Sequence, residues 1–122
     1  MTVAAVTSAE CKRNSAVAMG TFVQIPTNDY AAVDCTKADQ NIAIHIKNSI
    51  SDATHTAVIA QGDGLQGVAD LEITIGAKSE VVAVVESGAY KQMSGDNKGK
   101  ILIKDKTTTN TNALQVAAVV LP

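Results

Sequence analysis

Residues 41–47 read Asn-Ile-Ala-Ile-His-Ile-Lys and carry the clearest structural signal in the chain. Ile42, Ile44 and Ile46 alternate with polar or small residues, which is the two-residue period of a β-strand with one buried face and one face in water. Residues 70–75 repeat the pattern, with leucine and isoleucine on one face and acidic residues or threonine on the other. Two such strands predict a sheet that covers a core on one side.

Short segments of the same kind surround these two strands. They lie at residues 21–25, 31–35, 54–61, 80–86, 100–104 and 114–121, and turn residues separate them. The run of valines at 80–86 predicts a central strand that is buried on both faces. No segment has the period of a convincing amphipathic helix. This spacing predicts an all-β fold, a single-domain antiparallel β-sandwich or jelly-roll-like barrel over residues 16–122, preceded by an N-terminal arm over residues 1–15.

The predicted core consists of apolar residues that alternate along the expected strands. They are Ile42, Ile44, Ile46, Leu71, Ile73, Ile75, Val82, Val84, Ile101, Ile103, Val116 and Val119. The strongest loop signal is at residues 94–99, where Asp96 and Asn97 suit left-handed backbone conformations. The polar tract at residues 106–112 is expected to form an exposed hairpin tip.

Composition excludes several classes of protein. A chain of 122 residues is one domain by length, and its 46% hydrophobic content excludes disorder throughout. The net charge is −2 with scattered lysines, and the aromatic residues are Phe22, Tyr30 and Tyr90, so neither a basic stripe nor a stacking platform for nucleic acid exists. The apolar runs are far too short to span a membrane, and residues 1–10 do not resemble a signal peptide. These features favour a chain that is made and assembled in a cytoplasm.

Two cysteines and two histidines are the natural candidates for redox or metal chemistry. Cys11 and Cys35 could form a disulfide, but a single pair does not make a disulfide-stabilised framework. Small buried or half-buried thiols are the better interpretation. His45 and His55 flank the turn at residues 48–52 and would face each other in a hairpin centred on that turn. Zinc needs three or four ligands and no third ligand is evident, so we assign no metal. Replacing both histidines is therefore expected to leave the fold intact.

The carboxylates and the glycine-rich loops point to no catalytic site. Glu72, Glu80 and Glu86 lie at or near strand edges, where exposed carboxylates are ordinary, and no second group is positioned beside them. The loop at residues 95–100 resembles a phosphate-binding loop, but its glycines are too close together and a strand follows. The glycines at residues 62–64 lack the alternating acidic ligands of a calcium loop.

Three segments of the later half resemble small structural proteins of tailed bacteriophages. These segments are 67–72 (Gly-Val-Ala-Asp-Leu-Glu), 84–91 (Val-Val-Glu-Ser-Gly-Ala-Tyr-Lys) and 94–101 (Ser-Gly-Asp-Asn-Lys-Gly-Lys-Ile). The proteins that they resemble are similar in length and are head-decoration or accessory capsid proteins. The resemblance covers roughly residues 40–122. It implies a protein that binds the outside of an assembled capsid and clamps neighbouring major capsid subunits, and it brings no cofactor and no catalytic residue.

The resemblance leads us to expect a virion structural protein, a capsid decoration (cement) protein that bridges major capsid subunits on a phage head. The expected partners are the major capsid protein and further copies of the chain, as a dimer or trimer, with no nucleic acid and no membrane. The expected location is the capsid surface, after synthesis in the host cytoplasm. The alternative is an immunoglobulin-like or carbohydrate-binding adhesion module, which would favour a signal sequence and exposed aromatic residues. Neither interpretation makes the chain an enzyme.

The arm itself is a candidate contact site. Residues 1–14 have too little apolar periodicity to fold alone, so ordering them requires contacts that offset the lost backbone entropy. Val3, Ala4, Ala5 and Val6 have short side chains and can add a strand to an exposed sheet edge. We predict that this strand contacts a neighbouring chain, with the edge of its own domain as the alternative. In the first case, deleting residues 2–13 would leave the melting temperature of the domain nearly unchanged.

Overall fold

The described part of the chain forms ten strands and one helical turn in a computed structural model. The structure describes residues 3–16, 18, 21–26, 29–34, 41–50, 53–62, 69–107 and 113–121. The elements are β1 (Val3–Val6), β2 (Ala9–Glu10), β3 (Val23–Gln24), β4 (Tyr30–Asp34), β5 (Asn41–Asn48), β6 (His55–Ile59), β7 (Leu71–Ile75), β8 (Glu80–Glu86), α1 (Ser87–Tyr90), β9 (Lys100–Asp105) and β10 (Leu114–Val120). Among these residues, no helix has the length and hydropathy needed to cross a membrane.

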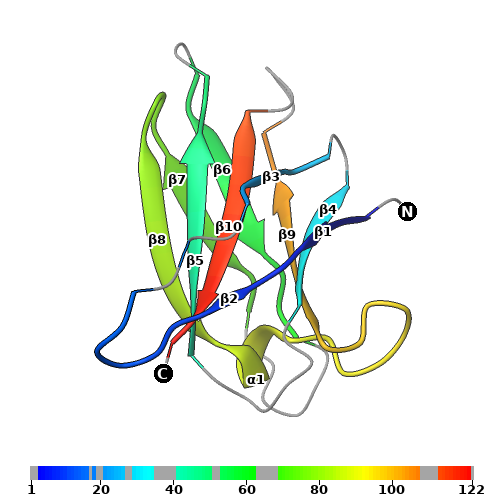
Figure 1. Cartoon of the computed structure of the whole chain (residues 1–122). Helices are drawn as coiled ribbons and strands as arrows, with labels where there is room; N and C mark the ends of the chain where they lie inside the picture. Colours follow the sequence, from blue (N-terminus) through cyan, green and yellow to red (C-terminus); the bar gives the residue numbers. More distant parts are fainter. Residues whose placement is uncertain are drawn as a thin grey trace.

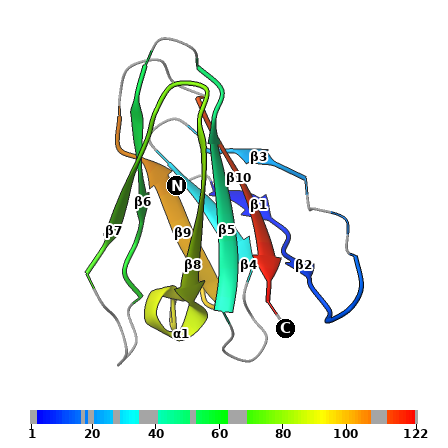
Figure 2. The same ribbon diagram turned by 90° about the vertical axis from the view of Figure 1, so that its left-hand side faces the viewer.

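The strands form two sheets that pack face to face (Figure 1). One sheet has the order β1-β4-β9-β6-β7, and the other has the order β2-β10-β5-β8 with β3 also paired to β10. Figure 2 shows the two layers from the side. The all-β sandwich that the sequence predicts is confirmed. The pairings within the body are antiparallel, and the two parallel pairings, β1 with β4 and β2 with β10, both involve the N-terminal strands.

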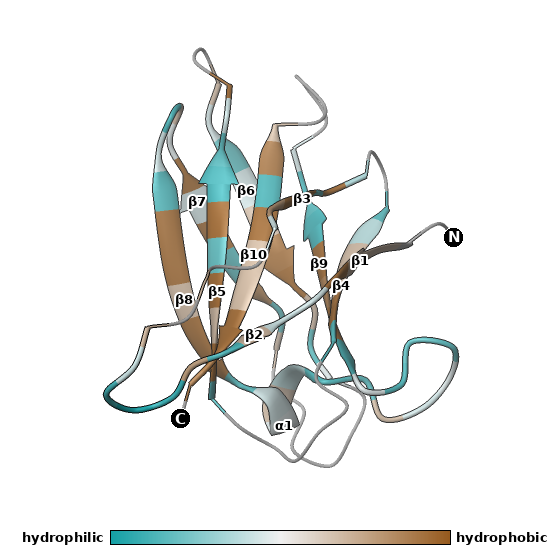
Figure 3. Cartoon of the chain, viewed as in Figure 1, coloured by the Kyte–Doolittle hydropathy of each residue, from teal (hydrophilic) through white to brown (hydrophobic). Residues whose placement is uncertain are grey.

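The core lies between the sheets and is built on the strand that the sequence shows best. β5 pairs with β10 on one side and β8 on the other, and Ile42, Ile44 and Ile46 are at most 1% exposed. Across from them, Ile101 and Ile103 of β9 are fully buried in the other sheet. Figure 3 shows the apolar bands along these strands. Ile75 and Val116 are buried as predicted, whereas Leu71, Ile73 and Val119 are half-buried.

Replacing Ile44 by alanine should destabilise the domain by about 2–5 kcal/mol, because the cavity lies where both sheets meet and cannot be filled by solvent. Urea unfolding followed by circular dichroism measures the loss. The matched control is Ala43→Ser, on the half-buried outer face of the same strand. That change should cost no more than about 0.5 kcal/mol. Equal losses for the two variants would contradict the observed orientation of β5.

The valine-rich strand β8 is not a central strand, so this part of the prediction is wrong. β8 pairs with β5 and ends its sheet, and its inward residues Val81, Ala83 and Val85 pack against the core. Val82 and Val84 point outward and are each 60% exposed. A continuous apolar run has the same appearance in a strand buried on both faces and in an edge strand with an apolar outer face. The sequence therefore could not distinguish the two.

The connection from β5 to β6 is also not a hairpin. β5 and β6 lie in different sheets, so the turn carries the chain across the sandwich. The side chain of Asn48, 1% exposed, organises this crossing: its amide nitrogen donates to the carbonyl oxygens of Ala53 (3.0 Å) and Ile75 (3.1 Å), and its oxygen accepts from the Ile50 N–H (3.1 Å). The predicted facing arrangement of the two histidines is therefore wrong.

Two predictions about loops are corrected in the same way. The strands on either side of the tract at residues 106–112, β9 and β10, belong to different sheets and do not pair as a hairpin; residues 108–112 themselves lie outside the described residues. Residues 94–99 do form a turn, but Gly95 (φ 82°) and Gly99 (φ 80°) adopt the left-handed conformation in place of Asp96 and Asn97. Glycine adopts this conformation without the steric cost of a β-carbon.

Candidate protein-contact surfaces

The N-terminal arm is paired within its own domain. β1 runs parallel to β4, from Val3 opposite Tyr30 to Val6 opposite Val33, and the Val6 side chain is 1% exposed. The chain then crosses to the other sheet, where β2 runs parallel to β10 and the Cys11 N–H donates to the Val120 carbonyl oxygen (2.8 Å). Figure 1 shows this dark-blue segment running across both sheets. Of the two alternatives for Val3, Ala4, Ala5 and Val6, the structure therefore shows the domain's own edge.

The segment that follows the arm is anchored to the outer face of the second sheet. The Phe22 ring meets the His45 ring edge-to-face with centroids 5.0 Å apart, and the Lys47 ammonium lies 4.6 Å from the Phe22 centroid. His45 Nε2 is in turn 2.7 Å from Glu80 Oε1. An open groove of about 500 Å³, lined by small residues such as Ala5, runs beside this segment. These contacts hold residues 21–24 against β10 and β5.

The end of the sandwich that carries α1 is a tightly bonded loop surface. The Gln92 N–H donates to the Lys100 carbonyl oxygen (2.9 Å), the Gly99 N–H returns a bond to the Gln92 carbonyl (2.7 Å), and the Gln92 side chain donates to the Gln61 carbonyl (2.9 Å). Gly62 approaches so closely that an added β-carbon would lie 2.8 Å from the Lys91 carbonyl oxygen. These contacts tie the loop after α1 to residues 61–62 and to the start of β9.

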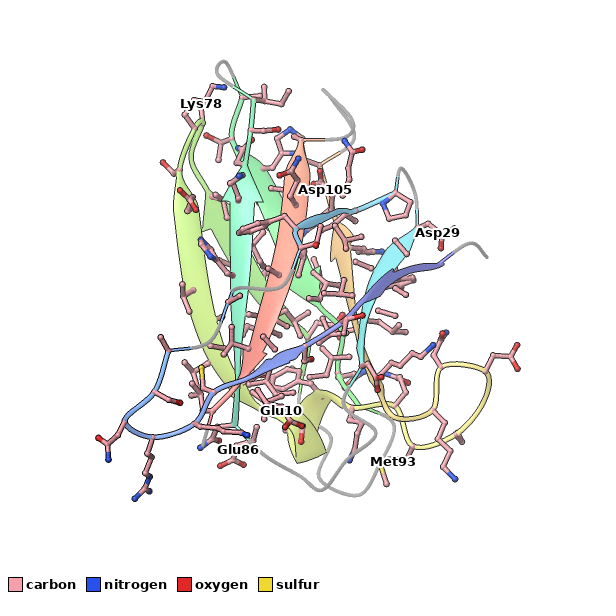
Figure 4. All side chains as sticks on the ribbon, viewed as in Figure 1. Glu10, Asp29, Lys78, Glu86, Met93 and Asp105 are labelled. Atoms are coloured by element: carbon pink, nitrogen blue, oxygen red, sulfur yellow. The ribbon has the colours of Figure 1, made fainter. Side chains whose placement is uncertain are left out.

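An exposed apolar side chain projects from this end of the sandwich. Met93 is 49% exposed, and it shares the loop with Asp96 and Lys98 (Figure 4 labels Met93). The segments of residues 84–91 and 94–101 that resemble phage structural proteins both lie at this end of the sandwich: the first covers the end of β8 and α1, and the second covers the loop that leads into β9 (Figure 1). Of the remaining segment, 67–72, residues 69–72 are described. We call the surface formed by residues 86–100 the α1 end.

The second exposed apolar feature is the outer face of β8, which is an edge strand of its sheet. Val82 and Val84 project from it, and within the described part of the chain no strand lies beyond it. The corresponding edge strand of the other sheet, β7, carries Glu72 and Thr74 on its outer face, and Glu72 bonds Lys106 Nζ at 2.9 Å. The two edge strands therefore differ at the middle of their outer faces, where β7 carries Glu72 and Thr74 and β8 carries Val82 and Val84 between two exposed glutamates.

A buried pair of titratable side chains lies inside the sandwich. His55 is fully buried, and its Nδ1 is 2.6 Å from Asp105 Oδ2 on the neighbouring strand β9. Asp105 Oδ1 accepts from the Thr107 N–H (2.9 Å), and the Thr107 hydroxyl accepts from the Thr56 N–H (3.0 Å). His55 Nε2 is buried without a hydrogen-bond partner in the described structure. The pair links β6, β9 and the loop after β9.

These side chains do not gather into a metal-binding cluster in the part of the chain that is described. No group of three histidine, cysteine, aspartate or glutamate side chains lies close enough to hold a metal ion there. His45 and His55 lie on different sheets and each has its own carboxylate partner. Cys11 is half-buried and free, and Cys35 lies outside the described residues, as do residues 63–68 of the glycine loop.

Sequence reasoning missed two of these features. The buried bond between His55 and Asp105 joins residues that are 50 positions apart, so no local sequence pattern indicates it. The edge position of β8 did leave a signal, because glutamates at both ends of the strand are typical of edges that are guarded against pairing.

The three aromatic residues, Phe22, Tyr30 and Tyr90, are all half-buried. Tyr30 lies beneath the Lys104 ammonium, which is 5.9 Å from its ring centroid. Comparison of the chain with protein-family models, curated proteins and solved structures found no match.

Proposed function

We propose that this chain is a virion structural protein that decorates the outside of a phage head and bridges major capsid subunits. The observation that carries the proposal is the α1 end, where two of the segments that resemble phage structural proteins lie at one end of the sandwich and Met93, between them in the sequence, is exposed. An exposed apolar residue on a pre-organised loop is a common anchor for protein contact, because little conformational entropy is lost on binding.

The internal construction of the domain supports the same role. The arm is bonded to both sheets, and the chain crosses between the sheets at Asn48 and again between β9 and β10. Such cross-connections resist shear between the layers, which a clamp between capsid subunits would experience. The polar pairs of the described residues serve packing: His45 with Glu80 supports Phe22, and His55 with Asp105 joins two strands.

The α1 end is the surface that we assign to the capsid. Met93 would enter an apolar depression between capsid subunits, with the side chains of Asp96 and Lys98 at the polar rim. The outer surface of an assembled head is the matching partner for a rigid loop surface, because neither side must reorganise. The adhesion alternative would instead rest on aromatic side chains that stack on sugars, and the described aromatic residues are half-buried.

Binding to purified heads tests the proposal. The full chain should co-sediment with heads that lack it, and mass spectrometry of mature particles should find it in a fixed ratio to the major capsid protein. Replacing Met93 by aspartate should weaken binding by at least about tenfold, because a desolvated charge replaces an apolar anchor. The control is Thr74→Asp, on the exposed face of β7, which should bind normally. Absence of the chain from purified particles, or its binding to a glycan array instead, would refute the capsid role.

A further inference from the structure

We propose that two copies of this chain exchange their N-terminal arms, so that β1 and β2 of each copy bind to the sheet edges of the other. Each domain of the resulting dimer is complete, because it receives the arm of the second copy in place of its own. This inference concerns self-association and does not rest on binding to a capsid, which we assign to the α1 end.

The site that receives the second arm is the one that the chain's own arm fills. β1 pairs parallel with β4, and Val6, opposite Val33, is 1% exposed. β2 pairs parallel with β10, with Ala9 opposite Val119. The arm of a second copy has the same sequence, so it forms the same backbone bonds and buries the same valine. The structure therefore shows which segment fits this site.

The arm lies at the outside of both sheets. β1 is the last strand of the β1-β4-β9-β6-β7 sheet, and β2 is the last strand of the β2-β10-β5-β8 path, so in the described structure no strand pairs with the outer side of either. Figure 1 shows the arm running from one sheet to the other. The arm can therefore detach without unpairing any strand of the body, which is the geometry that domain swapping requires.

The turn that follows the arm is the hinge of the exchange. β2 runs parallel to β10 whereas β3 runs antiparallel to it, so the chain reverses direction between the two strands. Residues 12–16, at the start of this reversal, are all exposed, and Figure 2 shows the turn projecting from the sandwich. Within these residues the structure describes one hydrogen bond, from the Ser15 hydroxyl to the Lys12 carbonyl oxygen (3.3 Å). Opening the turn therefore breaks no described hydrogen bond to the body of the domain.

The closed turn holds Asn14 in a backbone conformation that an open hinge releases. Its φ is 57°, in the left-handed region, which residues with a β-carbon disfavour and asparagine tolerates better than most. In the exchanged dimer the chain continues from β2 towards the other domain, and Asn14 is free to take an extended conformation. The dimer keeps all contacts of the arm and relieves this residue in both copies. Strain in a short hinge favours exchange.

Concentration decides between the two forms. A monomer keeps its own arm because the tether holds it near its site, at an effective concentration on the order of millimolar for a short flexible link. The arm makes the same contacts in both forms, so exchange becomes substantial when the protein itself approaches that concentration. Exchange also requires the arm to expose Val6 for a time, so the dimer should form slowly and persist after dilution.

A disulfide between the arm and β4 reports which copy supplies the arm. Ala5 and Ala32 lie opposite each other in the pairing of β1 with β4, so the full chain with Ala5→Cys and Ala32→Cys should form this bond, with Cys11 and Cys35 replaced by serine. One sample is refolded at about 10 µM and another at about 1 mM, and both are diluted to about 10 µM before oxidation. The first should give a monomer band on a denaturing gel without reductant, and the second a covalent dimer. The control, Ala5→Cys without Ala32→Cys, should give equal dimer bands in the two samples.

Substitutions at Asn14 test the hinge. Asn14→Gly removes the cost of the left-handed conformation and should lower the fraction of dimer, whereas the β-branched side chain of Asn14→Val increases that cost. The dimerisation constant of Asn14→Val should exceed that of Asn14→Gly by at least about tenfold, because each dimer opens two hinges. Residue 14 is exposed, so neither change alters the core. The control is Arg13→Val, an exposed neighbour without a left-handed φ, which should dimerise like the unmodified chain.

Three results would overturn the proposal. The first is a full chain that stays monomeric after refolding at about 1 mM. The second is a dimer in which the cysteines at residues 5 and 32 link only within one chain, because its arms would not be exchanged. The third is equal dimerisation of Asn14→Gly and Asn14→Val, because the turn would then not act as the hinge.

Discussion

Replacing Asp105 by alanine should destabilise the protein by about 3–5 kcal/mol, because it leaves the fully buried His55 without its partner. The carboxylate bonds His55 Nδ1 at 2.6 Å and also accepts from the Thr107 N–H at 2.9 Å, so the variant leaves two donors unpaired. His55 Nε2 has no partner in the described structure, which makes Asp105 the sole hydrogen-bond partner found for the ring. Urea unfolding at neutral pH measures the loss.

The matched control is Asp96→Ala, which removes the same carboxylate from an exposed turn. It should change the free energy of unfolding by no more than about 0.5 kcal/mol. A loss below about 1 kcal/mol for Asp105→Ala would mean that the buried bond is unimportant for stability. The same burial changes the expectation for a joint replacement of His45 and His55. From the sequence both histidines could be removed harmlessly, whereas the structure predicts a substantial loss from His55 alone.

The sequence predicts this fold well where the pattern is local. In β5 the side chains alternate strictly between core and outer face, so the two-residue period predicts both the strand and its orientation. β9 is predicted from the short apolar run Ile101–Ile103 between two lysines, and all three of its apolar residues are buried. Turn residues mark the ends of these strands and do not depend on the rest of the fold.

Prediction from the sequence fails for features that depend on which strands are neighbours in a sheet. The valines of β8 are compatible with a central or an edge position, and only the strand order distinguishes them. Likewise, the turn after β5 looks like a hairpin turn, and it is the buried side chain of Asn48 that ties it to Ile75 in the opposite sheet. The bond between His55 and Asp105 is also set by strand order, since β6 lies next to β9.

Deleting residues 2–13 should destabilise the domain by at least about 3 kcal/mol or prevent it from folding, because the deletion removes β1 and β2 and uncovers the edges of β4 and β10. Burial of Val6 alone contributes about 1.5–3 kcal/mol, and the parallel pairing with β4 is lost in addition. This expectation replaces the one from the sequence, in which the arm served a neighbouring chain and its removal left the domain unchanged. Thermal unfolding of the truncated and full chains measures the difference.

Two point variants test whether the stability comes from the buried side chain of the arm. Val6→Asp places a charge at a position that is 1% exposed. Ala5→Asp places the same charge at the preceding residue, which is exposed on the other face of β1. A buried, unpaired carboxylate costs several kcal/mol, so Val6→Asp should approach the effect of the deletion and Ala5→Asp should have little effect. If the truncated chain melted like the full chain, β1 would not be bound to β4 in solution. The arm would then be available to a neighbouring chain, as the sequence alone suggested.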